Sequence, residues 1–405
     1  MAESYLHGVE VVEIDGGTRP IRTVRSSTIG IVGTAPDADA EAFPLDTPVL
    51  VAGSPTEAAK LDTVGDGAGT LPAAMDLILE QTGALVVVVR VTEGADDAET
   101  VSNIIGGTDS SGNRQGVEAL LDAQSEVGFT PRILAAPGGV GTGYVDRDDT
   151  TDDITGAPVT TALESKAQQL AAMVYADGPN TTDSDAQTYR DLFGSARVMV
   201  CDPMVRVWDT EASAYVSRSL SSAAVGLRAR VDADRGFWVS ISNNLIYGIS
   251  GTDRPIDFTL GDPNSRANLL NEKEVSTVIQ QEGFRFWGGR TTSSDAKWAF
   301  EPVRRTADMV NDSILRAHMW AVDRGITKTF VEDVVEGVNE YLRSLKARGA
   351  ILGGEAWADP ALNTEDALKS GHLYIDFDFT PVYPAERITF RSHLVDGYLS
   401  EVIEG

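Results

Sequence analysis

Two glycine-rich segments are the first places in this sequence where chemistry could occur. A dinucleotide site needs Gly-x-Gly-x-x-Gly between a strand and a helix. Residues 30–35 read Gly-Ile-Val-Gly-Thr-Ala and supply only part of that pattern. Residues 138–143 have enough glycines to surround a phosphate, but they lead into a run of aspartates that would repel it. The first segment is therefore interpreted as a tight turn and the second as part of a mobile surface loop. No cofactor or cofactor-binding residue is predicted.

The acidic loop, residues 146–153, could attract calcium because clustered carboxylates suit hard cations. Its aspartates are Asp146, Asp148, Asp149, Asp152 and Asp153. The loop lacks the glycine and glutamate that an EF-hand needs, so a solvated loop is the favoured interpretation. The four histidines lack metal-ligand spacing with Cys or Glu, and no Gly-x-Ser-x-Gly motif occurs. No catalytic residue or metal ligand is predicted, so an enzyme is not expected.

Composition disfavours several kinds of partner. The chain has 61 acidic and 33 basic residues, a net charge of −28, whereas nucleic-acid binding requires Lys and Arg to neutralise phosphates. No apolar run approaches the roughly 18 residues of a membrane span, and no secretory signal is seen. We therefore expect no nucleic-acid partner, no membrane insertion and a cytoplasmic protein. The single cysteine, Cys201, ends an apolar run and is predicted to be a buried thiol.

The elements that must position any site alternate between strands and helices. Continuous apolar runs predict buried strands over residues 28–33, 85–91, 132–136, 172–175 and 197–201. Helical patterns lie between them, over residues 55–61, 71–82, 114–125, 160–171 and 184–193. A hairpin over residues 205–215 and a helix near 219–234 follow. This alternation predicts an α/β fold with a mainly parallel, helix-covered sheet.

A smaller α+β C-terminal domain is predicted to begin near Leu269. Asn271 and Glu274 have the spacing of a helix cap. The inward face of that helix would carry Val275, Val278 and Ile279. Residues 283–291 alternate aromatic and basic types before a Gly-Gly turn, which predicts a strand.

Two long helices are predicted next, over residues 303–323 and 329–348. The second has apolar residues at i, i+3, i+4 and i+7 spacing and glutamates on its opposite face. Thr329 and Glu332 match a capping box, and Gly349 is placed to end the helix.

Both ends of the chain read as strands without a local partner. Residues 7–14 alternate apolar and acidic types, and no nearby segment offers a hairpin partner. Residues 373–380 alternate strictly, two prolines interrupt the pattern, and residues 388–395 alternate again. We name residues 1–22 the N-terminal arm and residues 386–405 the C-terminal arm. These strands must pair either within the chain or with a neighbouring molecule.

Several motifs resemble the contractile tail sheath proteins of temperate myophages and R-type pyocins. They are His7-Gly-Val-Glu-Val-Val-Glu, Phe43-Pro-Leu-Asp-Thr-Pro-Val-Leu50, Gly283-Phe-Arg-Phe-Trp-Gly-Gly-Arg-Thr291 and the stretch from His318 to Thr329. The likeness runs in order through nearly the whole chain. The acidic loop is longer and more charged than the resemblance leads us to expect.

The resemblance implies a structural subunit of a contractile sheath. Copies would form a helical polymer, in six-fold rings, around a tail tube protein, between baseplate and tail terminator proteins. The sheath would assemble in the host cytoplasm, belong to the virion tail, and contract from a metastable extended state to drive the tube through a cell envelope. Strand addition to a sheet edge and head-to-tail contacts that do not close suit such a polymer.

The resemblance also implies where copies meet. Contacts of the N-terminal arm are predicted at His7, Val9, Val11, Val12 and Ile14. Contacts of the C-terminal arm are predicted at Ile388, Phe390, Arg391, Leu394 and Val395. Tube contact is assigned to Glu365, Asp366 and Lys369, whose charges could pair with the tube, and the acidic face of the helix over residues 329–348 is the second choice.

The predicted division has four parts: the N-terminal arm (1–22), an α/β outer domain (23–268), a tube-facing α+β inner domain (269–385) and the C-terminal arm (386–405). In fold class this is a helix-covered sheet domain, a smaller α+β domain and extended terminal β-arms. A Rossmann-like cofactor-binding enzyme is the alternative, since the sheet pattern alone is compatible with it.

Overall fold

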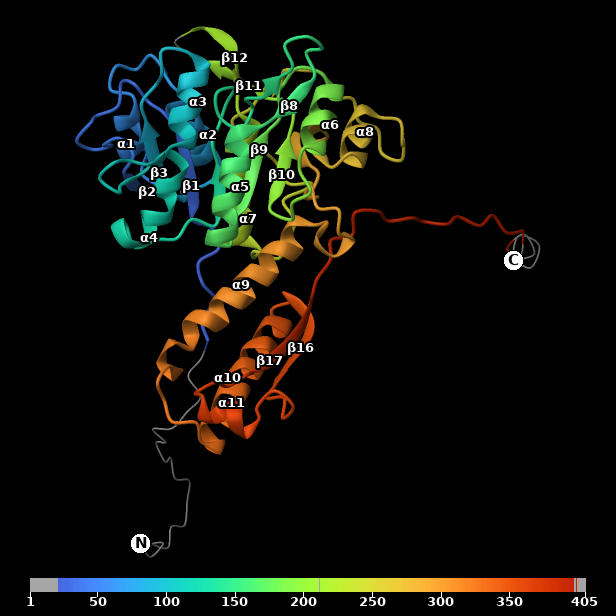
Figure 1. Ribbon diagram of the computed structural model, residues 1–405. Helices are drawn as coiled ribbons and strands as arrows, with labels where there is room; N and C mark the ends of the chain where they lie inside the picture. The colour runs from blue at the N-terminus through green and yellow to red at the C-terminus, as the bar shows by residue number, and fades with distance from the viewer. Residues whose placement is uncertain (1–20, 211, 397, 399–405) are drawn as a thin grey trace, which may run out of the picture.

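A mixed α/β fold with an eight-stranded sheet forms the larger part of the molecule (Figure 1). The computed structural model describes residues 21–210, 212–396 and 398. In spatial order the strands are β15 (Phe284–Trp287), β14 (Val275–Gln280), β10 (Val198–Cys201), β9 (Met173–Asp177), β6 (Ile133–Ala135), β1 (Ile29–Thr34), β3 (Leu85–Val91) and β2 (Pro48–Ala52). The strands from β14 to β3 run parallel, and both edge strands are antiparallel. The five predicted strands are confirmed, whereas β2 was not predicted.

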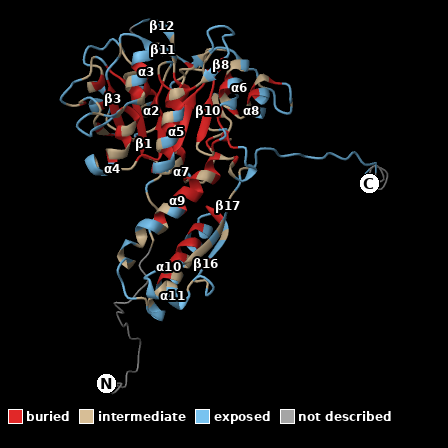
Figure 2. Ribbon diagram, viewed as in Figure 1, coloured by how far each residue is buried: buried red, intermediate tan, exposed pale blue. Residues whose placement is uncertain are grey.

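Helices cover both faces of this sheet, and alternate strand residues supply the two cores (Figure 2). Val86 and Val88 point into one core, while Val89 and Val91 point into the other. The first core is closed by α1 (Pro55–Ala58), the 3₁₀ helix η1 (Ala59–Leu61), α2 (Leu71–Gln81) and α7 (Leu220–Asp234). The second is closed by α3 (Asp97–Ile105), η2 (Gly116–Asp122), α5 (Pro158–Leu170), α6 (Asp183–Asp191) and α8 (Arg266–Glu272). The short helix α4 (Ala123–Glu126) directly follows η2. Strands buried on both faces explain the continuous apolar runs.

Small antiparallel sheets lie at the periphery of the large one. The predicted hairpin is present and pairs β11 (Val205–Asp209) with β12 (Ala214–Arg218), and β13 (Gly251–Thr252) adds to it. The others pair β4 (Gly107–Thr108) with β5 (Arg114–Gln115), and β7 (Asp146–Arg147) with β8 (Ile154–Gly156). The acidic loop lies in this last pair.

A smaller α+β part lies below the large sheet in the view of Figure 1. After β15 the chain forms η3 (Ala296–Trp298) and then α9 (Glu301–Ala317), which leads to the smaller part. The elements that follow α9 are η4 (Met319–Ala321), α10 (Lys328–Ala347), β16 (Ile351–Trp357), α11 (Glu365–Lys369) and β17 (Asp376–Pro381). The apolar face of α10 packs against the two-stranded sheet of β16 and β17 and against the middle of α9. A third core results, with Val338, Leu342 and Leu345 at its centre.

The helix predicted after Leu269 is wrong, because residues 275–280 form β14. Val275, Val278 and Ile279 are β-branched and fit a strand buried on both faces, where β14 pairs with β10. The Asn271 side chain donates to the carbonyls of Val275 and Trp287 instead of capping a helix. The large sheet therefore continues to Trp287, and the domain boundary predicted at residues 268 and 269 falls inside it.

The predicted capping box of α10 is also wrong by two residues. Thr327 is the N-cap, and its hydroxyl accepts a hydrogen bond of 3.2 Å from the amide of Phe330. Gly349 follows the helix with φ of 78°, a left-handed conformation that favours glycine, as predicted. Cys201 is buried at the end of β10, which confirms its predicted environment.

Candidate functional site

The C-terminal arm leaves the body of the molecule without a partner strand. Residues 387–396 belong to no sheet, and every one of them is exposed. Phe390 is 91% and Leu394 102% exposed, although both are large apolar side chains. Figures 1 and 2 show this segment running away from the folded part. The strand predicted over residues 388–395 therefore does not form among the described residues, because a strand requires hydrogen-bonding partners and none of the described segments lies beside it.

The start of the C-terminal arm is attached to the large sheet domain. Arg290 Nε and Nη2 donate to the two carboxylate oxygens of Glu386, at 2.8 and 2.5 Å. The Arg290 guanidinium lies over the ring of Phe300, and Phe300 packs edge-on against Tyr383. A bidentate pair of this kind fixes orientation as well as distance. The arm therefore projects from a defined point, just beyond residue 386.

The sheet of β16 and β17 has two outer edges that no other strand of the described chain covers. In an antiparallel pair every second residue directs its N–H and C=O away from its partner. At one end of the β16 edge, the side-chain amide of Asn339 on α10 donates to the carbonyl of Ala356 at 3.0 Å and accepts from its N–H at 2.8 Å. A two-stranded sheet is only marginally stable by itself, and open edges readily accept further strands. These edges are therefore candidate acceptors for an arm.

The residues assigned to tube contact lie together on α11. Glu365, Asp366 and Lys369 are all exposed, and Lys369 Nζ lies 3.3 Å from Glu365. Thr364 caps the helix by accepting from the amide of Ala367. The short helix therefore presents two carboxylates and one ammonium group at the surface. The predicted contacts of the N-terminal arm, His7, Val9, Val11, Val12 and Ile14, lie outside the described residues.

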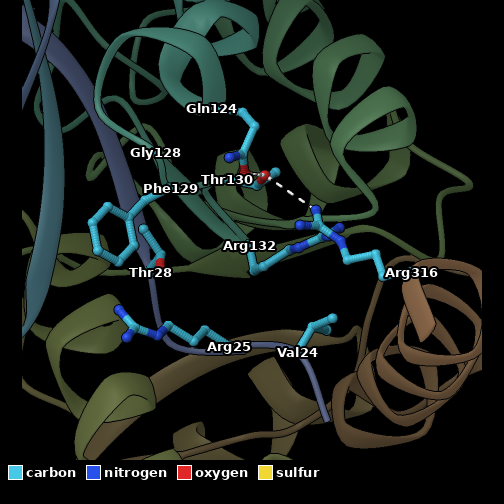
Figure 3. Close-up of a pocket in the computed structure, with 9 residues that line it drawn as sticks. All are labelled: Val24, Arg25, Thr28, Gln124, Gly128, Phe129, Thr130, Arg132 and Arg316. Atoms are coloured by element: carbon cyan, nitrogen blue, oxygen red, sulfur yellow. Dashed lines mark hydrogen bonds between the residues drawn. The ribbon is translucent and has the colours of Figure 1, made fainter. Parts of the chain in front are cut away.

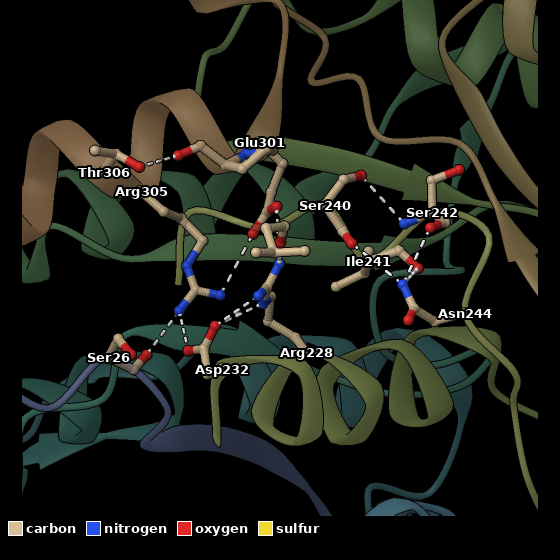
Figure 4. A network of polar contacts seen from close by, with 12 residues as sticks. Ser26, Arg228, Asp232, Ser240, Ile241, Ser242, Asn244, Glu301, Arg305 and Thr306 are labelled. Atoms are coloured by element: carbon tan, nitrogen blue, oxygen red, sulfur yellow. Dashed lines mark hydrogen bonds and ion pairs between the residues drawn. The ribbon is translucent and has the colours of Figure 1, made fainter. Parts of the chain in front are cut away.

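A buried ion network joins α9 to the large sheet domain (Figure 4). Glu301 of α9 accepts from Tyr175 of β9 at 2.8 Å and from Arg228 of α7 at 3.3 Å. Arg305, one turn further along α9, bonds to both Glu301 and Asp232. All four charged side chains are at most 2% exposed. Burial alone lowers the pKa of Arg305, but the charges of Asp232 and Glu301 raise it above its ordinary value.

Two further ion pairs tie α9 to the start of the strands. Arg197, just before β10, donates to Asp308 at 2.6 and 2.9 Å, and Arg132, just before β6, pairs with Asp312. Sequence reasoning missed these contacts. The sequence does show the i, i+4 spacing of Glu301 and Arg305, but exposed surface pairs have the same spacing, so it does not reveal that this pair is buried. The first half of α9 is therefore a rigid extension of the sheet domain.

Two buried carboxyl groups lie at the carboxyl ends of the parallel strands, where α/β proteins often bind ligands. Asp177, the last residue of β9, accepts from Ser219, from the amide and hydroxyl of Ser221, and from the amide of Gly138. Asp202, after β10, accepts from Arg254 and from the amide of Asn180. Burial raises the pKa of Asp177, and it raises the pKa of Asp202 to about 6 against the opposing effect of Arg254. These bonds give both carboxyl groups a structural role.

Replacing Asp202→Asn should remove a pH dependence of stability. Because the folded pKa of Asp202 lies near 6, above the ordinary 3.8 of an aspartate, this carboxyl contributes most stability at low pH, and that contribution is lost as pH rises from 4 to 6. The free energy of unfolding of the wild type, minus that of the variant, should fall by roughly 2 kcal/mol between pH 4 and pH 6. Urea unfolding at pH 4, 5, 6 and 7 measures it. A difference that rises with pH would contradict the assignment.

Metal and membrane sites have no candidate in the described part of the chain. No three Asp, Glu, His or Cys side chains between residues 21 and 396 gather closely enough to hold a metal ion. In the acidic loop, Asp148 instead accepts from the amides of Thr150 and Thr151, which close the turn. None of the described helices combines the length and apolar character that crossing a bilayer requires.

Three family models match successive parts of the chain. The phage tail sheath C-terminal domain matches residues 293–394, and the phage tail sheath protein central domain matches residues 112–292. The N-terminal region of domain III of tail sheath protein Gp18 matches residues 26–91.

Full-length relatives and solved structures agree with these matches. A putative prophage major tail sheath protein of Pseudomonas aeruginosa (strain UCBPP-PA14) is 42% identical over 99% of both chains. The tail sheath protein of Escherichia phage P2 is 40% identical over 98% of both. The contracted helical sheath of the anti-feeding prophage has the same fold, with a TM-score of 0.68 and 22% identity over 96% of this chain and 99% of that one. The contracted PVC sheath gives a TM-score of 0.67 at 16% identity over 98% and 99%. None of these matches supports a cofactor-binding enzyme.

Proposed function

Because this chain belongs to the phage tail sheath protein family, we propose that its copies polymerise around a tail tube through their terminal arms. The chain is a structural subunit of a contractile tail sheath and a component of the virion tail. The sheath contracts from a metastable extended state and drives the tube through the envelope of the target cell. The observation that carries the role of the arms is the exposed, unpartnered C-terminal arm, with Phe390 and Leu394 in solvent.

The C-terminal arm is long enough to reach a neighbouring copy. Ten residues, 387–396, extend from the Arg290–Glu386 pair, and at about 3.3 Å per residue they span up to roughly 33 Å. We propose that this arm adds as a strand to an open edge of the β16–β17 sheet of a neighbour. Main-chain hydrogen bonds would give affinity, and Phe390 and Leu394, on one face of the strand, would give register. The N-terminal arm would take the other open edge.

We propose a division that differs from the sequence-based one between the outer and the inner domain. The outer domain runs from residue 23 to about residue 300, because β14 and β15 complete its sheet. The inner domain comprises α10, β16, α11 and β17, and α9 connects the two. Glu365, Asp366 and Lys369 of α11 are proposed to face the tail tube, because three charged side chains on one short exposed helix suit electrostatic pairing. Six-fold rings and contacts with baseplate and terminator proteins complete the assembly.

Electron microscopy of the purified full-length chain tests this function. Negative staining should show long hollow tubes with a helical surface lattice, and sedimentation should separate them from monomer. Strand exchange between copies predicts that tubes form from this chain alone, since each copy carries both arms and both acceptor edges. A chain that stays monomeric by light scattering at every concentration would contradict the proposal.

A further inference from the structure

A pocket of about 140 Å³ lies where the large sheet domain meets α9 (Figure 3). Thr28 precedes β1, and Thr130 and Arg132 precede β6, so the pocket lies at the amino ends of these parallel strands. Arg25 enters it from the segment that leads to β1, and Arg316 enters from α9. Three separate parts of the chain therefore line one small space.

The pocket has an excess of positive charge in an otherwise acidic protein. Its arginines are Arg25, Arg132 and Arg316, and the carboxylate that Arg132 and Arg316 share is Asp312. The Arg25 guanidinium lies 4.9 Å from the centre of the Phe129 ring and bonds to no acidic side chain of the described residues. Three positive charges against one negative charge leave the pocket able to accept a further carboxylate.

The acidic loop has an excess of negative charge, and it lies at the other end of the same strands. It follows β6 and precedes α5, and so lies at the carboxyl end of the sheet. Backbone bonds between Asp148, Asp152 and Asp153 close the loop and leave residues 149–151 at its tip. Arg147 is its only basic residue and already pairs with Asp152 and Asp185. The Asp149 side chain is exposed at the tip and has no partner in the described chain.

We propose that Asp149 of one copy enters the arginine pocket of the next copy and bonds to Arg25 and Arg316. Complementary charges at opposite ends of one chain form a heterologous contact, which repeats without closing and suits a helical polymer. Arginine favours such a contact because its planar group binds a carboxylate in a bidentate manner. This inference rests on the proposed polymer and names a contact that does not involve the arms.

Cysteine cross-linking within the polymer tests the contact. The full chain with Arg25→Cys and Asp149→Cys should form disulfides between successive copies under mild oxidation, since Cys201 is buried and does not compete. A non-reducing gel should show a ladder of dimers, trimers and longer species. Each single variant should give no ladder. The matched control pairs Arg25→Cys with Asp97→Cys, because Asp97 is an exposed aspartate that follows β3 at the same end of the sheet.

Charge reversal gives a second measurement that does not depend on cysteine geometry. Arg25→Glu and Asp149→Arg should each raise the concentration needed for polymerisation by about tenfold, and the double variant should restore most of that loss. The contact would be overturned if the double-cysteine variant polymerised but gave no ladder, or if the Asp97 control gave an equally strong ladder. Either result would leave the sheath function intact. A wild-type chain that never polymerises would overturn both. The contact would also be overturned if inorganic phosphate stabilised the monomer through Arg25 and Arg316 and the double-cysteine variant gave no ladder. The pocket would then be a small-anion site.

Discussion

Removing residues 387–405 is expected to abolish sheath polymers while the rest of the chain stays folded. The cut preserves the Arg290–Glu386 pair, and none of the described residues it removes is buried. The melting temperature should therefore stay within about 2 °C of the wild type, because exposed side chains contribute little to stability. Negative-stain microscopy and sedimentation should find only monomers. Removal of residues 1–15 is predicted to have the same effect through the other arm.

A point substitution separates the strand contact from the length of the arm. Phe390→Ala should weaken polymerisation by about ten- to a hundredfold, because a buried aromatic side chain contributes roughly 1.5–3 kcal/mol. The matched control is Thr389→Ala, which lies on the opposite face of the proposed strand and should change polymerisation little. Both variants should unfold like the wild type, since both side chains are exposed in the single chain. Tubes formed by the truncated chain would refute the linkage.

Glu301→Ala is expected to lower the free energy of unfolding by about 3–5 kcal/mol. It leaves Arg228 and Arg305 buried with Asp232 as their remaining partner, and an uncompensated buried charge is strongly destabilising. Tyr175 also loses the acceptor of its hydroxyl group. Urea unfolding of the monomeric fraction, followed by tryptophan fluorescence, measures the change.

Glu332→Ala is the matched control for that substitution. Glu332 on α10 pairs with Lys328 at 3.6 Å, with the same i, i+4 spacing as Glu301 and Arg305. The side chains of Lys328 and Glu332 are, however, both more than 60% exposed. An exposed pair contributes at most about 1 kcal/mol, so this variant should unfold close to the wild type. If the two variants lost similar stability, the buried network would not be what holds α9 to the sheet domain.

The anchoring of α9 has a consequence for contraction. Ion pairs at Glu301, Asp308 and Asp312 join its first three turns to the sheet domain. The α10 and β16–β17 unit packs on the middle of the same helix through the third core. A subunit built in this way can rotate as one body, so we expect the bending during contraction to occur at the arms, beyond Glu386 and before residue 23.

Much of the fold could be predicted because the signals are local. Strand β3 is built mainly of valines, and the apolar residues of α10 recur at helical spacing. The order of such elements was enough for an α/β sheet, and the motifs from His7 to Thr329 were enough for the family. The excess of acidic charge and the single cysteine likewise follow from composition.

What only the tertiary structure decided depends on partners far away in the chain. Residues 275–280 became a strand because β10 lies beside them, and Glu301 became a buried anchor because Arg228 reaches it from α7. Residues 388–395 show the same dependence on distant partners, since their alternating sequence stays unpaired where no described segment supplies a second strand. Sequence alone determined which segments favour a helix or a strand, because those preferences are local. Pairing, burial and the charge of a site are long-range, and the folded chain alone decides them.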